Sequence, residues 1–355
     1  MKICILGHGL TSLVLAKALI NKGIFVDIFF SKMSKKKDKS RTIGISNSNV
    51  EFLNKNIFNI EKFSWNIKKI EIYSENFNNE KIFEFKKKDQ RLFSVVHNHL
   101  LISNLTSQLK KSKFIKFKKK IINYRLTNKK YNLIINCDIK NDFTKKFFTK
   151  KLSKNYNSYA YTTIIEHNKF LKNNVAIQNF TKEGPIAFLP ISDTKTSVVY
   201  SIKGNKRNDI INLIKKYNLK YKIKKIHKIN YFDLKLSNLR SYYYNNILAF
   251  GDLLHKIHPL AGQGFNMSIR DIKVLLKIIE FKINNGLDLD KSICYEFEKE
   301  NKHKNFLFSN GVDFIYEFFN IENKFNNRIL NRYIKFIVNN KFANQFFIKF
   351  ADKGI

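Results

Sequence analysis

The sequence predicts an α/β protein in which a parallel-sheet domain carries an inserted, mostly antiparallel β domain and is followed by C-terminal helices. Three observations predict this class. The chain opens as strand, glycine turn, helix and strand; its middle holds short segments of alternating polarity; and after Gly251 the pattern is mostly helical. A length of 355 residues suits two domains, or one domain with a large insertion.

The first strand–helix–strand unit lies at the N-terminus. Residues 2–6, KICIL, form a short apolar run that predicts a buried strand. Residues 10–23, LTSLVLAKALINKG, follow with helical spacing, and Gly23 stands where a helix would end. Residues 24–30, IFVDIFF, predict a second strand. Such a unit implies a parallel sheet.

The middle of the chain alternates between two domains. Strand-like segments occur within residues 65–97 (KKIEIY, KIFEF, LFSVV) and 159–202 (GPIAFLPI, TSVVYSI). Between them lie a helical segment, LLISNLTSQLKK, and two strand-like segments, KFIKF and YNLIINC. The predicted first domain comprises residues 1–64, 98–158 and 241–285, the inserted domain 65–97 and 159–240, and a C-terminal helical region 286–355.

Composition limits the class of protein. Apolar residues make up 44% of the chain, yet no stretch reaches the about 18–20 uninterrupted apolar residues of a membrane-spanning helix. The start, MKICILGHGL, is unlike a signal peptide, because glycines follow the first apolar run. Cys4, Cys137 and Cys294 are scattered, which predicts neither a metal site nor a disulfide framework and favours a reducing cytoplasm.

The formal net charge is +38, with 66 Lys and Arg against 28 Asp and Glu. The lysines are spread over most segments, and Lys, Asn, Ile and Phe are overused together, which indicates a base bias of the genome. We therefore expect no nucleic-acid binding, although a positive surface would favour contact with anionic lipid.

The first glycine turn is GHGLTS, with Gly7, Gly9 and Ser12 at the spacing of the dinucleotide pattern G-x-G-x-x-G. It follows a strand and opens a helix, whose free N–H groups would face a pyrophosphate as in a Rossmann-like domain. Phe30 stands where an acidic residue would hold the ribose. An ordinary strand–helix turn is the alternative interpretation.

The second glycine turn follows the strand-like ILAFGD. Asp252 is placed to hold a ribityl hydroxyl, and the amides near Gly262, Gln263 and Gly264 precede a helix. Such amides suit a group that becomes negative, such as the N1–C2 edge of a reduced flavin. His255 and His258 flank the segment KI; as neutral imidazoles they would accept a proton from a bound ligand, or simply hold the loop by hydrogen bonds. A glycine-rich loop kept for packing is the alternative.

The pattern GD-x-x-H-x-x-HP-x-AGQGFN-x-x-x-RD in residues 251–271 resembles the second FAD motif of the class A flavoprotein monooxygenases. It is most similar to the branch that hydroxylates ubiquinone precursors. Residues 41–53 (RTIGISNSNVEFL), 94–105 (SVVHNHLLISNL) and 180–200 (FTKEGPIAFLPISDTKTSVVY) resemble further segments of that branch. The similarity extends over nearly the whole chain.

The resemblance implies a p-hydroxybenzoate-hydroxylase-like fold, with a Rossmann-like FAD domain and a mostly β substrate domain. It implies hydroxylation of a polyprenylated phenol in ubiquinone biosynthesis, through a flavin C4a-hydroperoxide, with FAD as cofactor, NAD(P)H as reductant and molecular oxygen as co-substrate. His255, His258 and Pro259 are the expected catalytic residues. The expected FAD contacts are Gly7, Gly9, Ser12, Arg41, Asp138, Asp252, Pro259, Gly262, Gln263, Gly264 and Asn266.

Three positions depart from the family pattern: Ser12 replaces a glycine, Phe30 replaces the ribose-binding acid, and Ile139 follows Asp138 where the family has glycine. They keep a second hypothesis open, a non-catalytic relative that binds a quinone precursor or a partner enzyme.

The expected location is the cytoplasm, with peripheral contact to the inner face of the membrane and with other ubiquinone-synthesis enzymes. Residues 328–350, RILNRYIKFIVNNKFANQFFIKF, mix bulky apolar and basic residues at helical spacing. They predict either a helix on a membrane surface or one packed on the FAD domain.

Overall fold

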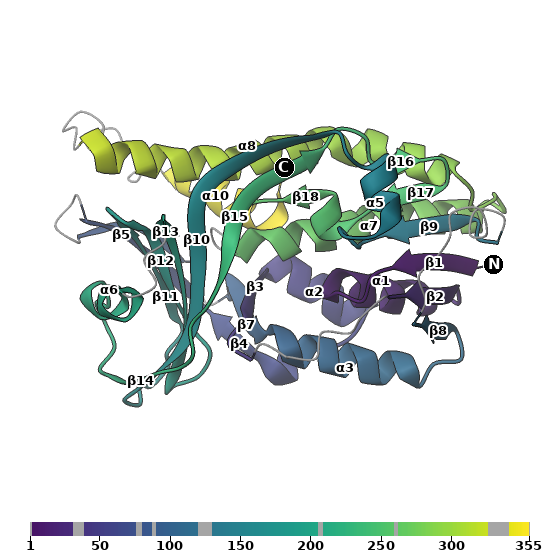
Figure 1. Cartoon of the computed structure of the whole chain (residues 1–355). Coiled ribbons are helices and arrows are strands. Elements are labelled where there is room, and N and C mark those ends of the chain that lie inside the picture. Colours follow the sequence, from purple (N-terminus) through teal and green to yellow (C-terminus); the bar gives the residue numbers. More distant parts are fainter. Residues whose placement is uncertain are drawn as a thin grey trace.

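The computed structural model describes residues 2–30, 39–75, 80–86, 90–119, 130–204, 209–258, 262–325 and 341–354. They form three sheets with helices on both sides (Figure 1). The predicted α/β class, with parallel and antiparallel sheets and C-terminal helices, is confirmed.

The first sheet contains the N-terminal unit. Its order is β16-β17-β9-β1-β2-β8, and every neighbouring pair is parallel except β16 with β17. Its strands are β1 (Lys2–Leu6), β2 (Phe25–Phe29), β8 (Ile115–Lys118), β9 (Leu133–Asn136), β16 (Tyr243–Tyr244) and β17 (Ile247–Ala249). Helices α1 (Leu10–Ile20) and α3 (Asn98–Lys110) pack together beside it. The central strands β1, β9 and β17 are mainly apolar and almost completely buried, as a parallel sheet covered on both faces requires.

The second sheet is larger and mostly antiparallel, with the order β18-β15-β10-β13-β12-β11-β5-β6 and β14 paired to β10. The long, curved β10 and β15 connect it to the first domain (Figure 1). Helix α6 (Ile210–Lys216) covers its outer face. Its strands are β5 (Lys69–Ser74), β6 (Lys81–Lys86), β10 (Lys151–His167), β11 (Val175–Thr181), β12 (Gly184–Pro190), β13 (Lys195–Lys203), β14 (Ile223–Ile226), β15 (Asn230–Leu239) and β18 (His255–Lys256).

A three-stranded antiparallel sheet, β3-β7-β4, is the third. It consists of β3 (Thr42–Ser46), β4 (Ser64–Ile67) and β7 (Phe93–His97). Within the range 65–97 that the sequence assigns to the inserted domain, β4 and β7 thus form a separate sheet with β3, whereas β5 and β6 join the large sheet.

The remaining chain is mainly helical, as expected after Gly251. Helix α8 runs along one side of the molecule and reaches from the first domain to the large sheet (Figure 1). The helices not yet named are η1 (Glu61–Phe63), α2 (Asn47–Asn56), α5 (Asp142–Phe147), η3 (Gly251–Leu253), α7 (Gln263–Asn284), α8 (Ser292–Phe325) and α10 (Lys341–Lys353). None of the helices in the described ranges combines the length and apolarity needed to cross a membrane.

Candidate active site

The two glycine turns meet at one cavity of about 780 Å³. Residues 9–12 and Asp252, Gly262, Gln263 and Gly264 all line it. The turns lie close to each other, because a Cβ atom on Gly251 would stand 3.1 Å from the Thr11 side chain. The sequence alone predicts each turn; the fold brings them together.

The N-terminus of α1 is open toward the cavity. Gly9 is its N-cap residue, no side chain caps the helix, and no acidic residue lies in the first turn. Gly9 has φ −81° and ψ 174°, which any residue can adopt, and a Cβ atom there would meet nothing within 4 Å. The protein itself therefore does not require glycine at this position, whereas a ligand that approaches the backbone closely would.

The N-terminus of α7 is open as well, but its turn is tightly held. Gly262 has φ +65°, and a Cβ atom there would lie 3.2 Å from the backbone nitrogen of Gly44 in β3. No side chain caps this helix, and no acid lies in its first turn. Gln263 Oε1 is buried without a hydrogen-bond partner among the described residues. These features leave backbone N–H groups and a positive dipole end available to an anionic group.

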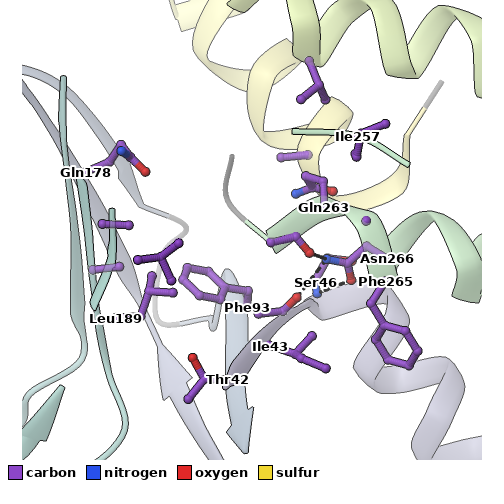
Figure 2. A pocket seen from close by; sticks show the side chains of 18 of the residues that line it. Thr42, Ile43, Ser46, Phe93, Gln178, Leu189, Ile257, Gln263, Phe265 and Asn266 are labelled. Atoms are coloured by element: carbon purple, nitrogen blue, oxygen red, sulfur yellow. Dashed lines mark hydrogen bonds between the residues drawn. The ribbon is translucent and has the colours of Figure 1, made fainter. Parts of the chain in front are cut away.

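Asn266 fixes this turn to β3. Its Oδ1 accepts a hydrogen bond from Ser46 N at 2.9 Å (Figure 2) and one from Asn49 Nδ2 of α2 at 3.0 Å, and its Nδ2 donates to Gly44 O at 2.9 Å. The Asn266 side chain lines the cavity, but its amide already has protein partners on both ends. Its contribution to a cofactor site is therefore to hold the turn in place.

Aromatic rings surround the end of β2, where a ribose-binding acid would stand. The ring of His8 lies 5.1 Å from that of Phe30 and 5.7 Å from that of Phe117, and burial lowers the pKa of His8. Asp27 is fully buried within β2 and accepts hydrogen bonds from Lys118 and Tyr131. Asp27 is thus occupied elsewhere and does not replace the missing acid.

The loop after β9 lies behind the first turn. Gly7 has φ +107°, and a Cβ atom there would stand 3.4 Å from Asp138 N and from Ser12 Oγ. Asp138 Oδ1 accepts a hydrogen bond from Lys140 N at 2.9 Å, and Ile139 is 52% exposed. Ser12 and Cys137 line the cavity, whereas Gly7, Asp138 and Ile139 are not among its lining residues.

His255 lines the cavity and belongs to a buried polar chain. Its Nε2 lies 2.5 Å from Asp271 Oδ2, and Asn305 Nδ2 donates to Asp271 Oδ1 at 3.0 Å. His255 and Asp271 are each almost fully buried. A hydrogen bond to this carboxylate requires a proton on Nε2 or on Asp271, and Nδ1 is buried and has no hydrogen-bond partner among the described residues. Sequence reasoning missed Asp271 and Asn305.

His258 lies elsewhere. It is buried between two tyrosines, stacked on Tyr316 at 4.1 Å between ring centroids and edge-on to Tyr156 at 5.3 Å, and it is not among the lining residues. Burial lowers the pKa of His258 to about 3. Arg41 is exposed and lines the cavity. Pro259, predicted both as catalytic and as an FAD contact, lies outside the described residues.

The opposite wall is the large sheet. β5, β11 and β12 turn a mainly apolar face to the cavity, and Gln178 is the polar side chain within it. Sequence reasoning missed Gln178, although its place between Ala176 and Phe180 in a strand could have indicated one shared face. It also missed a wall formed by α10, which is attached to α2: Ser48 N donates to Asp352 Oδ1 at 2.8 Å.

These residues fit FAD. Open glycine backbone at Gly9, a left-handed Gly262, an unpartnered Gln263 oxygen and two uncapped helix N-termini around one cavity are what a flavin dinucleotide requires. The aromatic cluster at Phe30 means that the adenosine ribose lacks its usual carboxylate.

Sequence comparison supports the resemblance. No family model matches the chain. It is 25% identical over 210 residues to the mitochondrial ubiquinone biosynthesis monooxygenase COQ6 of Xenopus tropicalis, covering 47% of this chain and 45% of that protein. The Homo sapiens protein of that name is 27% identical over 183 residues, which cover 39% of each. The chain spans about half the length of such curated relatives.

Solved structures share the fold over nearly the full chain. The p-nitrophenol 4-monooxygenase PnpA from Pseudomonas putida DLL-E4 has a TM-score of 0.77 at 11% identity and covers 99% of this chain and 97% of its own. Klebsiella pneumoniae HpxO, complexed with FAD and uric acid, has a TM-score of 0.76 at 11% identity, with the same coverage of 99% and 97%. The predicted resemblance to the ubiquinone-biosynthesis monooxygenases is confirmed by the sequence matches, and the solved monooxygenase structures confirm the fold.

Proposed function

We propose that this relative of the ubiquinone-biosynthesis monooxygenases is an FAD-dependent aromatic hydroxylase that acts on a prenylated phenol. The observation that carries the proposal is the cavity itself, because one of its ends is lined by two uncapped helix N-termini and the other by an apolar sheet. Such a cavity suits two ligands together, a charged dinucleotide and a hydrophobic aromatic substrate.

FAD, when bound, supplies the oxygen-activating chemistry, and the protein supplies binding and orientation. The amides of the α1 turn would hold the pyrophosphate, and Asp252 a ribityl hydroxyl. The amides of Gln263 and Gly264 would stabilise negative charge at the edge of the reduced ring. NAD(P)H as reductant and oxygen as co-substrate are part of the same proposal.

His255 is the residue of this chain best suited to move a proton. A ring carbon that gains a hydroxyl must lose its hydrogen as a proton before the ring is aromatic again. In this proposal the hydrogen bond to Asp271 keeps a proton on Nε2, and Nδ1 is the acceptor. We assign His255 the role of base and Asp271 that of its positioning residue.

The substrate would enter beside α8. Phe314 lines the cavity and is 69% exposed, so the cavity reaches the surface there, and Phe346 of α10 is 63% exposed. Exposed aromatic residues on a basic protein suit a membrane surface that supplies an insoluble substrate. Cytoplasmic location, contact with the inner face of the membrane and contact with other ubiquinone-synthesis enzymes are proposed on this basis. Residues 328–340 of the predicted amphipathic stretch lie outside the described part.

The test uses the purified full chain. After loading with FAD, NAD(P)H oxidation should rise when a prenylated phenol is added, and mass spectrometry should find one atom of ¹⁸O from labelled oxygen in the product. Failure to take up FAD, or oxidation without labelled product, would contradict the proposal.

The second hypothesis, a non-catalytic relative, is favoured by the aromatic cluster at Phe30 alone. A strain that lacks this gene separates the two. Rescue of ubiquinone synthesis by the wild-type chain but not by Asp252→Ala with Gly262→Val supports the enzyme, and equal rescue supports the non-catalytic role.

A further inference from the structure

Gln178 is a polar side chain in an apolar wall. The cavity-lining residues contributed by its own strand and the two neighbouring strands are otherwise apolar: Ile70, Ile72, Ala176, Ile177, Phe180, Ala187 and Leu189. The sheet register pairs Gln178 with Ile72 on β5 and with Ala187 on β12. An amide at the centre of such a surface is costly unless its hydrogen-bonding groups are used.

The protein satisfies only the nitrogen of the Gln178 amide. Gln178 Nε2 donates to the backbone oxygen of Ile186 at 3.1 Å. Because a carbonyl oxygen can only accept, the nitrogen must be the atom on that side, and Oε1 is the atom left over. No described residue donates a hydrogen bond to Oε1. Figure 2 shows the Gln178 side chain projecting from the sheet toward the space in front of Gln263 and α7.

We propose that Gln178 is a substrate-orienting residue whose Oε1 accepts a hydrogen bond from the hydroxyl of a neutral phenol. The inference rests on the proposed hydroxylase function and names what its substrate must present. Gln178 Oε1 can only accept, so it holds a phenol or an aromatic amine and excludes a phenolate or an aryl ether. With the hydroxyl fixed at the sheet, the opposite edge of the ring faces the α7 side of the cavity.

This orientation separates the roles of two residues. Gln178 holds the oxygen that the substrate already carries, whereas His255, a lining residue of the same cavity, is the proposed acceptor of the proton of the ring carbon. Selectivity for neutral phenol is notable on a chain of formal charge +38, because general electrostatics would favour the anion.

Binding to the purified, FAD-loaded chain tests the inference without turnover. Calorimetry would compare 2-prenylphenol with its methyl ether. We expect the wild-type chain to prefer the phenol by about tenfold or more, since the ether leaves Oε1 unpaired. Gln178→Met, which keeps length and volume but accepts no comparable hydrogen bond, should reduce the preference to within about twofold. Thr162→Val, another polar-to-apolar change on the cavity wall, should retain it.

A second measurement needs no variant. The affinity of the wild-type chain for 2-prenyl-4-nitrophenol, which ionises near neutral pH, should fall as pH rises through the pKa of this ligand. Equal affinity for phenol and ether, affinity for neither, or tighter binding of the phenolate would each overturn the inference. Selective binding without product would contradict the hydroxylase instead, and product without selectivity would contradict only the role of Gln178.

Discussion

The turns before α1 and α7 both end at an uncapped helix N-terminus, but different residues surround them. Both present an uncapped helix N-terminus to one cavity. The α7 turn is braced, because Gly262 stands against Gly44 and Asn266 ties it to β3 by two hydrogen bonds and to Asn49 of α2 by a third. The α1 turn has open space at Gly9 and an aromatic cluster where a carboxylate would hold the ribose.

The difference teaches where the cofactor site is rigid. Preorganised donors stabilise developing charge only if they cannot move away, and the α7 turn meets this condition. The α1 turn provides attraction for a pyrophosphate, but the end of β2 adds no specific grip on the ribose. We therefore expect substitutions in the turn that opens α7, such as Gly262, to affect both binding and chemistry, and those near α1 to affect affinity alone.

The largest effect is expected from breaking the braced turn. Gly262→Ala adds a Cβ atom 3.2 Å from Gly44 N at φ +65° and should abolish FAD binding and lower the melting temperature. Gly286→Ala is the matched control, with the same φ of +65° and nothing within 4 Å. Each alanine variant should lose roughly 1–2 kcal/mol of stability because of the left-handed backbone. FAD titration then separates this strain, which both variants share, from disruption of the α7 turn, which only Gly262→Ala causes. Equal effects would contradict the account.

The pH dependence of stability tests the burial of His258, which lies just before the α7 turn in the sequence. The unfolded chain binds a proton at His258 below pH about 6.5, and the folded chain only below about 3, because burial lowers this pKa. Stability should therefore fall as pH drops through this window, by roughly 1.4 kcal/mol per unit. Urea unfolding should show a shallower pH dependence of the free energy of unfolding for His258→Phe than for wild type. His303→Gln, at an exposed position, should keep the wild-type pH dependence.

Asp252 tests whether the second glycine turn holds a ribityl hydroxyl of FAD. Asp252→Ala should weaken FAD binding by about ten- to a hundredfold, equivalent to about 1–3 kcal/mol for one lost hydrogen-bonding carboxylate. Equilibrium dialysis measures the change, with the exposed Asp288→Ala as control. FAD affinity within twofold of wild type would remove Asp252 from the site.

Asp271 separates chemistry from binding at the flavin end. Asp271→Asn should lower kcat by about tenfold to a hundredfold with FAD affinity unchanged, because His255 can then hold its proton on the wrong nitrogen. The pH profile of kcat should change too, which a merely structural role would not produce. An unchanged profile would contradict the assignment.

The smallest effect is expected at the loop after β9. Ile139 is 52% exposed and not among the cavity-lining residues. Ile139→Gly should therefore change the FAD dissociation constant by less than about twofold, within the usual range of surface substitutions. A larger gain in affinity would show that this departure from the family pattern weakens the site.

The sequence allowed the turns, their helices and the fold class to be predicted, because glycines, apolar periods and turn residues are local signals. It could not distinguish His255 from His258, since their difference lies in what packs around them: Asp271 and the cavity for one, two tyrosines for the other. Gln178 and Asp271 were missed because their roles depend on partners far along the chain or on a cavity.

The most direct test is calorimetric titration of the apo chain with FAD, for wild type, Gly9→Val and Gly262→Ala. Gly9→Val is the sharpest variant, because its extended backbone and open surroundings tolerate a side chain. The account predicts that one FAD binds per wild-type chain. For Gly9→Val it predicts at least a hundredfold weaker FAD binding, a loss of about 2.7 kcal/mol of binding free energy, at an unchanged melting temperature. A wild-type chain that binds no FAD, or a Gly9→Val chain that binds it equally well, would contradict the claim that both helix N-termini hold the cofactor.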